Sequence, residues 1–110
     1  MNKQILLNAA DHIEKNWASF DWLDWCSEGP CGTRGCIAYH IMLGNGKRWP
    51  KEAGSLKAQQ LADLDIGQRL RLFYGHADIP VSHLRDLAGT KKLAKAAAKY
   101  IRDFVEREGK

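Results

Sequence analysis

Long apolar runs are missing from this sequence. A helix that crosses a bilayer needs roughly 20 consecutive apolar residues, and no segment of the chain approaches that length. The run Ile5-Leu6-Leu7 is also too short for the core of a secretory signal peptide. We therefore expect a soluble, cytoplasmic protein that has no contact with a membrane.

Cysteine is scarce, and the number of cysteines is odd. Three thiols cannot all pair within the chain, whereas a secreted domain of this size usually carries an even set of disulfides. A reducing compartment keeps such thiols reduced. The count therefore predicts no obligatory disulfide.

The motifs of several enzyme and nucleic-acid-binding classes are also absent. The sequence has no phosphate-binding glycine loop, no paired carboxylates and no complete catalytic triad. It has no helix-turn-helix signature, no zinc finger and no strand pattern of a single-strand-binding barrel. With 110 residues, of which 45% are hydrophobic, the chain suits one domain over residues 1–110 and leaves little room for a deep substrate cleft. We expect a non-enzymatic protein that needs no cofactor.

Positive charge is present in moderate excess. Lysine and arginine number 17 against 13 acids, which gives a net charge of +4, and the excess begins at Arg34. A field of this size attracts acidic partners but is weaker than that of dedicated nucleic-acid binders.

Apolar residues recur at helical spacing, and nothing alternates like a strand. Ile5, Leu6, Ala9, Ile13 and Trp17 predict a first helix over residues 3–17 with these side chains on its buried face. Further helices are predicted over residues 36–43, from 55 to 64, from 66 to 74, over 81–87 and from 91 to 105. Between the first two helices, residues 18–32 read as an ordered, tryptophan-rich loop. The fold class is therefore all-α, as a compact bundle of five to six short helices.

Capping residues mark the ends of these helices. Thr33 and Thr90 are suited to be N-caps, and Asp65 with Gln68 has the spacing of a capping box. Gly44 is suited to a left-handed C-terminal stop.

All three cysteines fall in one segment that leads into the second helix. Cys26, Cys31 and Cys36 are evenly spaced, and His40 follows Cys36 by one helical turn. Three thiolates and one imidazole are a zinc donor set, although the tight Cys-x-x-Cys pair of zinc knuckles is missing. A cysteine near a helix start can also ionise and act as a nucleophile. The third interpretation, that Cys31 and Cys36 are buried apolar fillers, is the one we favour.

Part of this segment resembles a known group of proteins. The stretch Cys31-Gly-Thr-Arg-Gly-Cys36-Ile-Ala resembles the Cys-Gly-Thr-x-x-Cys-Ile-Ala-Gly signature of small uncharacterised phage and prophage proteins. Tyr39 stands where the signature has glycine, and the rest of the chain fits more loosely. The resemblance implies a helical fold and a bacterial or viral origin, hence the cytoplasm of a bacterial host cell. It implies no activity and no catalytic residue.

Two surfaces are candidates for meeting a partner. The first combines aromatic anchors with loop cations, namely Trp22, Trp25, Arg34, Lys47, Arg48, Trp49 and Lys51. The second is the outer face of the last helix, which carries Lys91, Lys92, Lys95, Lys99 and Arg102 and could bind nucleic acid. Such a stripe is also the ordinary solvated face of an amphipathic helix.

These observations together predict a small protein that binds another macromolecule. The first interpretation is a phage- or prophage-encoded modulator of a host protein. The alternatives are a nucleic-acid-binding protein that uses the basic loop and the last helix, and a small zinc-binding or cysteine-dependent protein. The sequence leaves the oligomeric state open.

Overall fold

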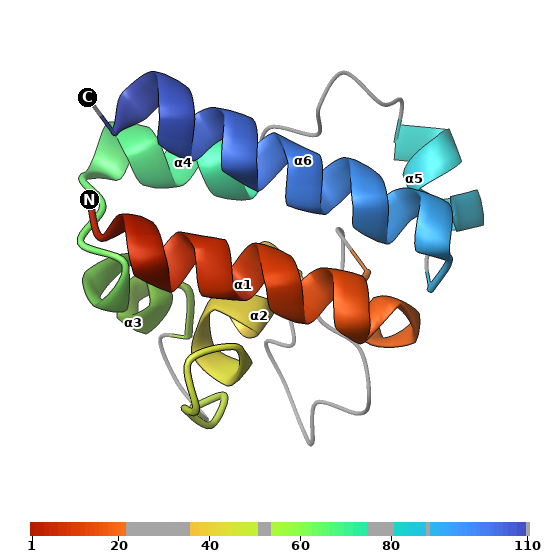
Figure 1. Ribbon diagram of the computed structural model, residues 1–110, viewed down its shortest axis with the longest axis horizontal. Coiled ribbons are helices and arrows are strands. Elements are labelled where there is room, and N and C mark those ends of the chain that lie inside the picture. Colours follow the sequence, from red (N-terminus) through yellow and green to blue (C-terminus); the bar gives the residue numbers. More distant parts are fainter. Residues whose placement is uncertain (22–35, 51–53, 75–80, 88, 110) are drawn as a thin grey trace.

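The computed structural model describes residues 1–21, 36–50, 54–74, 81–87 and 89–109 (Figure 1). Its helices are α1 (Lys3–Lys15), the short 3₁₀-helix η1 (Trp17–Ser19), α2 (Ile37–Leu43), α3 (Gly54–Leu61), α4 (Ile66–Tyr74), α5 (Val81–Leu87) and α6 (Lys91–Glu108). These ranges contain no strand, and the radius of gyration is 12.5 Å. The compact all-α class is therefore confirmed. None of the helices within these ranges combines the length and the apolar character of a membrane span.

The centre of the fold is the pair α1 and α6, which lie side by side along the long axis of the molecule (Figure 1). Each helix turns one apolar stripe toward the shared core, as its sequence period predicts. The buried residues are Leu6, Ala9, Ala10 and Ile13 on α1, and Leu93, Ala94, Ala97, Ala98, Ile101, Phe104 and Val105 on α6. The large side chains contribute about 1.5–3 kcal/mol each through burial. The alanines leave little bulk between the two backbones.

A polar seam joins α1 to α2 on the other side of α1. The Asn8 amide donates to the Oδ1 of Asn45 over 2.9 Å, and the Asn45 amide donates to the carbonyls of Ile5 and Ile41 over 3.0 and 2.7 Å. Asn45 therefore ties both helices together where α2 ends. Because these polar groups satisfy one another, the seam avoids the cost of burying them unpaired.

Gly44 lies at this seam, and its role differs from the prediction. Its φ is −65°, so it is not a left-handed stop, and the positive φ of +75° falls on Gly46. A Cβ atom on Gly44 would lie 2.8 Å from the carbonyl oxygen of His40 and 3.0 Å from both the Asn8 carbonyl oxygen and the His12 Cβ. Glycine is needed here because α1 passes very close to the end of α2.

The local capping signals are largely confirmed. Asp65 Oδ1 accepts from the Gln68 N–H over 2.8 Å, and Gln68 Oε1 accepts from the Asp65 N–H over 3.1 Å, which is the reciprocal capping box. Thr90 accepts from the N–H of Leu93 as the N-cap of α6. For α2 the prediction was wrong, because the N-cap is Cys36 rather than Thr33.

The first helix also ends earlier than predicted. It stops at Lys15, and after Asn16 the chain tightens into η1, which contains Trp17. Trp17 is 36% exposed, so it does not continue the buried stripe of α1 as predicted. Phe20, the next aromatic residue, is fully buried. Residues 22–32 of the predicted tryptophan-rich loop lie outside the described residues.

The close approach at Gly44 predicts a large effect of a single added methyl group. We expect Gly44→Ala to lower the free energy of unfolding by about 2 kcal/mol, because backbone atoms of α1 and α2 must move apart. Urea denaturation followed by circular dichroism measures this change. Gly67→Ala is the control, because a Cβ there meets only the ends of the Arg71 and Asp65 side chains. The control should leave stability unchanged or raise it by up to about 1 kcal/mol, and an equal loss in both variants would contradict the proposed role of Gly44.

Candidate functional site

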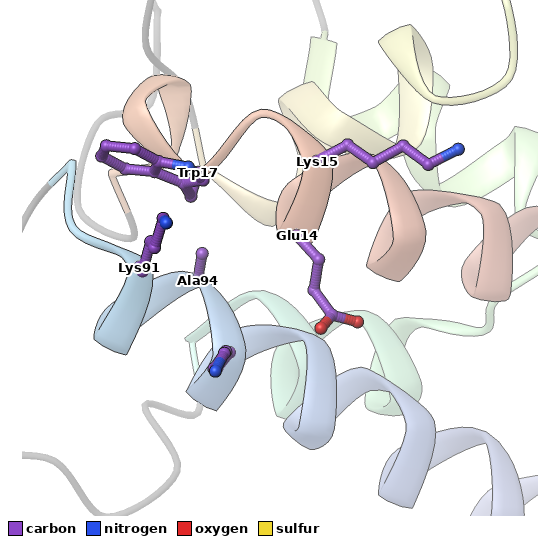
Figure 2. A pocket seen from close by; sticks show the side chains of 6 residues that line it. Glu14, Lys15, Trp17, Lys91 and Ala94 are labelled. Atoms are coloured by element: carbon purple, nitrogen blue, oxygen red, sulfur yellow. The ribbon is translucent and has the colours of Figure 1, made fainter.

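The recess in which we place the candidate site lies between the end of α1 and the start of α6 (Figure 2). It has a volume of about 370 Å³ and is lined by Glu14, Lys15, Trp17, Lys91, Ala94 and Lys95. Ala94 lies between the two helices, where its small side chain leaves the space open. The recess thus depends on the packing of α1 against α6, which brings Trp17 next to residues far along the chain.

An aromatic ring and an ammonium group face each other in this recess. The Nζ of Lys91 lies 5.5 Å from the centroid of the Trp17 ring, which is cation–π distance. Figure 2 shows the Lys91 side chain ending beside the ring, while Lys15 points away from it. The exposed ring therefore holds one cation at the mouth of the recess.

The positive charges at the start of α6 are not neutralised by neighbours. Lys91, Lys92 and Lys95 are exposed and form no ion pair with any residue that the structure describes. The first turn of α6 holds no acidic residue, although the positive end of the helix dipole favours acids there. The lysines therefore add to the positive field of the helix end.

The remaining cations of the predicted stripe are paired. Lys99 Nζ lies 2.7 Å from Asp103, one turn further along α6. Arg102 lies 2.8 Å from Asp11 and also pairs with Glu14, so it joins the outer edges of α1 and α6. The five cations predicted to act together are thus divided into three unneutralised lysines and two residues with structural partners.

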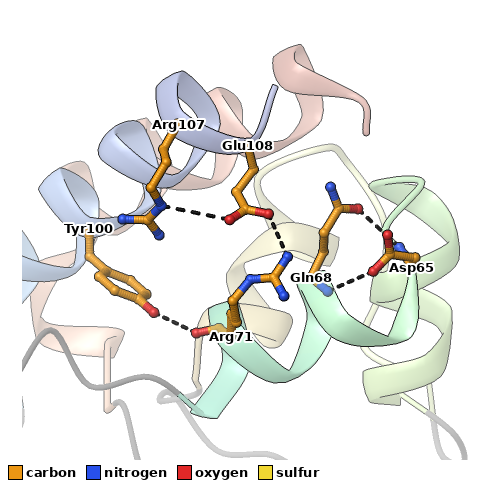
Figure 3. Close-up of polar contacts among 6 residues, drawn as sticks. All are labelled: Asp65, Gln68, Arg71, Tyr100, Arg107 and Glu108. Atoms are coloured by element: carbon orange, nitrogen blue, oxygen red, sulfur yellow. Dashed lines mark hydrogen bonds and ion pairs between the residues drawn. The ribbon is translucent and has the colours of Figure 1, made fainter. Parts of the chain in front are cut away.

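Polar contacts join the C-terminal end of α6 to α4 (Figure 3). Glu108 pairs with Arg71 of α4 and lies 3.7 Å from Arg107, while the Tyr100 hydroxyl donates to the Arg71 carbonyl. The capping box of Asp65 and Gln68 lies in the same region. Arg71 and Glu108 there join α4 to α6, whereas Lys91, Lys92 and Lys95 at the opposite end of α6 have no ion pair with a described residue.

Of the predicted aromatic and loop candidates, the three that the structure describes do not line this recess. Lys47 and Arg48 are exposed after α2, in a loop that Figure 1 places on the side of α1 away from α6. Trp49 is partly buried against the core, with its ring centroid 5.8 Å from that of Tyr39 and its ring against Gly54. Trp49 therefore packs inward. The other candidates, Trp22, Trp25, Arg34 and Lys51, lie outside the described residues.

The cysteine segment is only partly described. Cys36 is buried, with 2% of its surface exposed, as the packing interpretation predicts; Cys26 and Cys31 lie outside the described residues. In the part of the chain that the structure covers, no three His, Cys, Asp or Glu side chains converge as metal ligands would.

His40, the fourth ligand of the zinc hypothesis, is engaged within the core. It is fully buried, its Nδ1 lies 2.8 Å from the Nδ1 of His12, and its Nε2 lies 3.1 Å from the Ser19 carbonyl oxygen. A carbonyl only accepts, so Nε2 of His40 carries the proton, and His12 donates from Nδ1. Both ring nitrogens of His40 thus have partners, and a metal would have to displace one of them.

Burial controls the charge of this histidine pair. It lowers the pKa of His40 to about 4, against the opposing effect of the hydrogen bond to Ser19 and with a further lowering by the charge of His12. Burial also lowers the pKa of His12. The pair is therefore neutral at pH 7, where it serves packing rather than proton transfer.

No family model, curated protein or solved structure matches this chain. The class that the structure defines is a small all-α protein with a recess lined by an aromatic ring and cations. Among the residues that line this recess, the sequence predicted Lys91 and Lys95 as candidate binding residues, but it did not predict Trp17 or Glu14 as such. The available signal was Asn16, a poor helix former next to Trp17, which favours a helix end and an exposed ring.

The buried histidine predicts a loss of stability in mild acid. Between pH 6.5 and about 4, His40 is protonated in the unfolded chain but stays neutral in the folded protein. The free energy of unfolding therefore falls as the pH falls. We expect a loss of about 1.5 kcal/mol between pH 6.5 and 5 from this group, with His12 adding in the same direction. Urea denaturation across this range measures the slope.

His40→Gln removes the titrating group and should flatten that slope, whatever its effect on stability at pH 7. His83→Gln is the matched control, because His83 is exposed on α5, and it should keep the slope of the parent. A parent slope unchanged by His40→Gln would show that other groups titrate and would contradict the assignment.

Proposed function

We propose that this protein is a small, non-enzymatic binding protein that docks another protein on the Trp17 face. We define this face as Trp17, Lys91, Lys92 and Lys95 together with the recess between α1 and α6. The proposal also includes the expectation of a phage- or prophage-encoded modulator of a host protein in the bacterial cytoplasm. The observation that carries it is the exposed Trp17 ring beside three unneutralised lysines.

Two physical arguments support a docking role. Tryptophan is enriched among the residues that dominate binding energy at protein interfaces, because it offers a large apolar area at low cost in conformational entropy. Unneutralised cations around it accelerate the encounter with an acidic partner and select against a basic one. The fold does not need these charges, since the cations that hold helices together are paired with acids elsewhere.

A second candidate function is nucleic-acid binding. The lysines at the start of α6 favour it, because cations beside an aromatic ring also suit a phosphate chain with stacked bases. The basic loop after α2 does not extend this surface, since it lies on the other side of α1. This separation is why we rank it below a protein partner.

Site-directed photo-crosslinking in the bacterial host tests the proposal. A photoreactive benzoylphenylalanine at position 92 lies beside the recess without replacing a residue that lines it, and the same group at position 57 reports on α3. Both positions are exposed lysines, so the two variants lose the same charge. We expect a discrete protease-sensitive adduct from position 92 and none from position 57.

The double variant Lys91→Glu/Lys95→Glu should abolish the adduct from position 92. A nuclease-sensitive adduct there would favour the second candidate. Adducts that are equal at positions 92 and 57, or absent at both, would contradict docking at the Trp17 face.

A further inference from the structure

The structure points to the chemistry of the segment that docks at the Trp17 face. We infer that it is an acidic peptide segment whose carboxylate binds at Lys91 and Lys95 while a neighbouring apolar side chain packs on Trp17. This inference rests on the proposed function and adds the recognition chemistry to it.

Charge is the first argument. Lys91 and Lys95 are one helical turn apart on the same face of α6, and both line the recess. The carboxylate of Glu14 on α1, which lines the recess, is already paired with Arg102, as is that of Asp11. Neither lysine forms an ion pair with a described residue, so an incoming carboxylate finds two ammonium donors that are not bound to another acid.

The ring of Trp17 holds the Lys91 ammonium group in place before a ligand binds. Its contact with the Lys91 ammonium, at 5.5 Å from the ring centroid, restricts a long and otherwise mobile side chain. An ammonium held in place loses less conformational entropy when it binds. The exposed part of the same ring offers an apolar surface to the residue next to the carboxylate.

Size is consistent with single side chains rather than with a whole helix. A volume of about 370 Å³ lies at the small end of the range for ligand pockets, about 300–1,000 Å³. The recess can admit one or two side chains of an extended segment. The rest of that segment would run over the exposed surface near Lys92.

The arrangement of charges disfavours a nucleic-acid strand. Such a strand needs a continuous track of cations for successive phosphates, but Asp103 and the pairing of Arg102 interrupt the stripe after Lys95. A short acidic segment needs only the two lysines and the ring.

Calorimetric titration with defined peptides tests this inference. The probe is an acetylated peptide of glutamates around one central phenylalanine, and its comparison is the same peptide with glutamine in place of glutamate. We expect the glutamate peptide to bind at least about tenfold more tightly than the glutamine peptide. An oligothymidylate of similar charge forms the third arm and should bind more weakly than the glutamate peptide.

Two double variants distinguish the effect of the recess lysines from the effect of the net charge of the protein. Lys91→Glu/Lys95→Glu should weaken binding of the glutamate peptide at least about tenfold, whereas Lys47→Glu/Lys57→Glu makes the same change in net charge at exposed positions outside the recess and should weaken it less than about threefold. Acids at the start of α6 suit the helix dipole, so the first variant is expected to fold. Trp17→Ala should also weaken binding, and Trp17→Phe should restore part of it.

Equal losses in the two double variants would overturn the inference, because binding would then follow overall charge. Tighter binding of the oligothymidylate, or equal binding of the two peptides, would overturn it as well. If these results came with a protein adduct from position 92, the proposed function would stand without the acidic segment.

Discussion

The packing of α1 against α6 is the constraint on which the rest of the structure depends. Two apolar stripes, rich in alanine on both helices, meet along most of their length. Arg102 closes the outer edge through its pairs with Asp11 and Glu14. This contact sets the end of α1 beside the start of α6 and so forms the recess between Trp17 and Lys95. Because the docking face is built from packed helical elements, η1 and α6, we expect it to rearrange little on binding.

The opposite side of α1 combines close packing with buried hydrogen bonds and shows the roles of Cys36 and His40. There, α2 approaches so closely that Gly44 is required, and hydrogen bonds through Asn45 and the His12–His40 pair satisfy the buried polar groups. Cys36 is buried at the start of α2 and His40 within it. Of the residues that suggested metal or thiol chemistry, these two therefore serve the interior, and the surface for a partner lies elsewhere.

The sequence predicted those features that depend on neighbouring residues. The capping box of Asp65 and Gln68 and the cap at Thr90 act within one turn, so their spacing is visible in the sequence. The contact of Trp17 with Lys91 and the pairing of His12 with His40 join residues far apart in the chain, and only tertiary packing decides them. The lysine stripe of α6 was visible too, and so was the spacing of Lys99 and Asp103 by one turn. The pairing of Arg102 with Asp11 and Glu14 depends on the packing of α1 against α6, which no local pattern reveals.

Mapping the contact surface residue by residue tests the central claim most directly. Two-dimensional ¹H–¹⁵N NMR spectra of the protein, recorded with and without the acidic peptide, locate the atoms whose surroundings change. The account predicts the largest shifts at the indole N–H of Trp17 and the backbone amides of residues 90–96. Shifts centred on Lys47 and Arg48 after α2, or on the exposed Ile66 and Leu70 of α4, would contradict it.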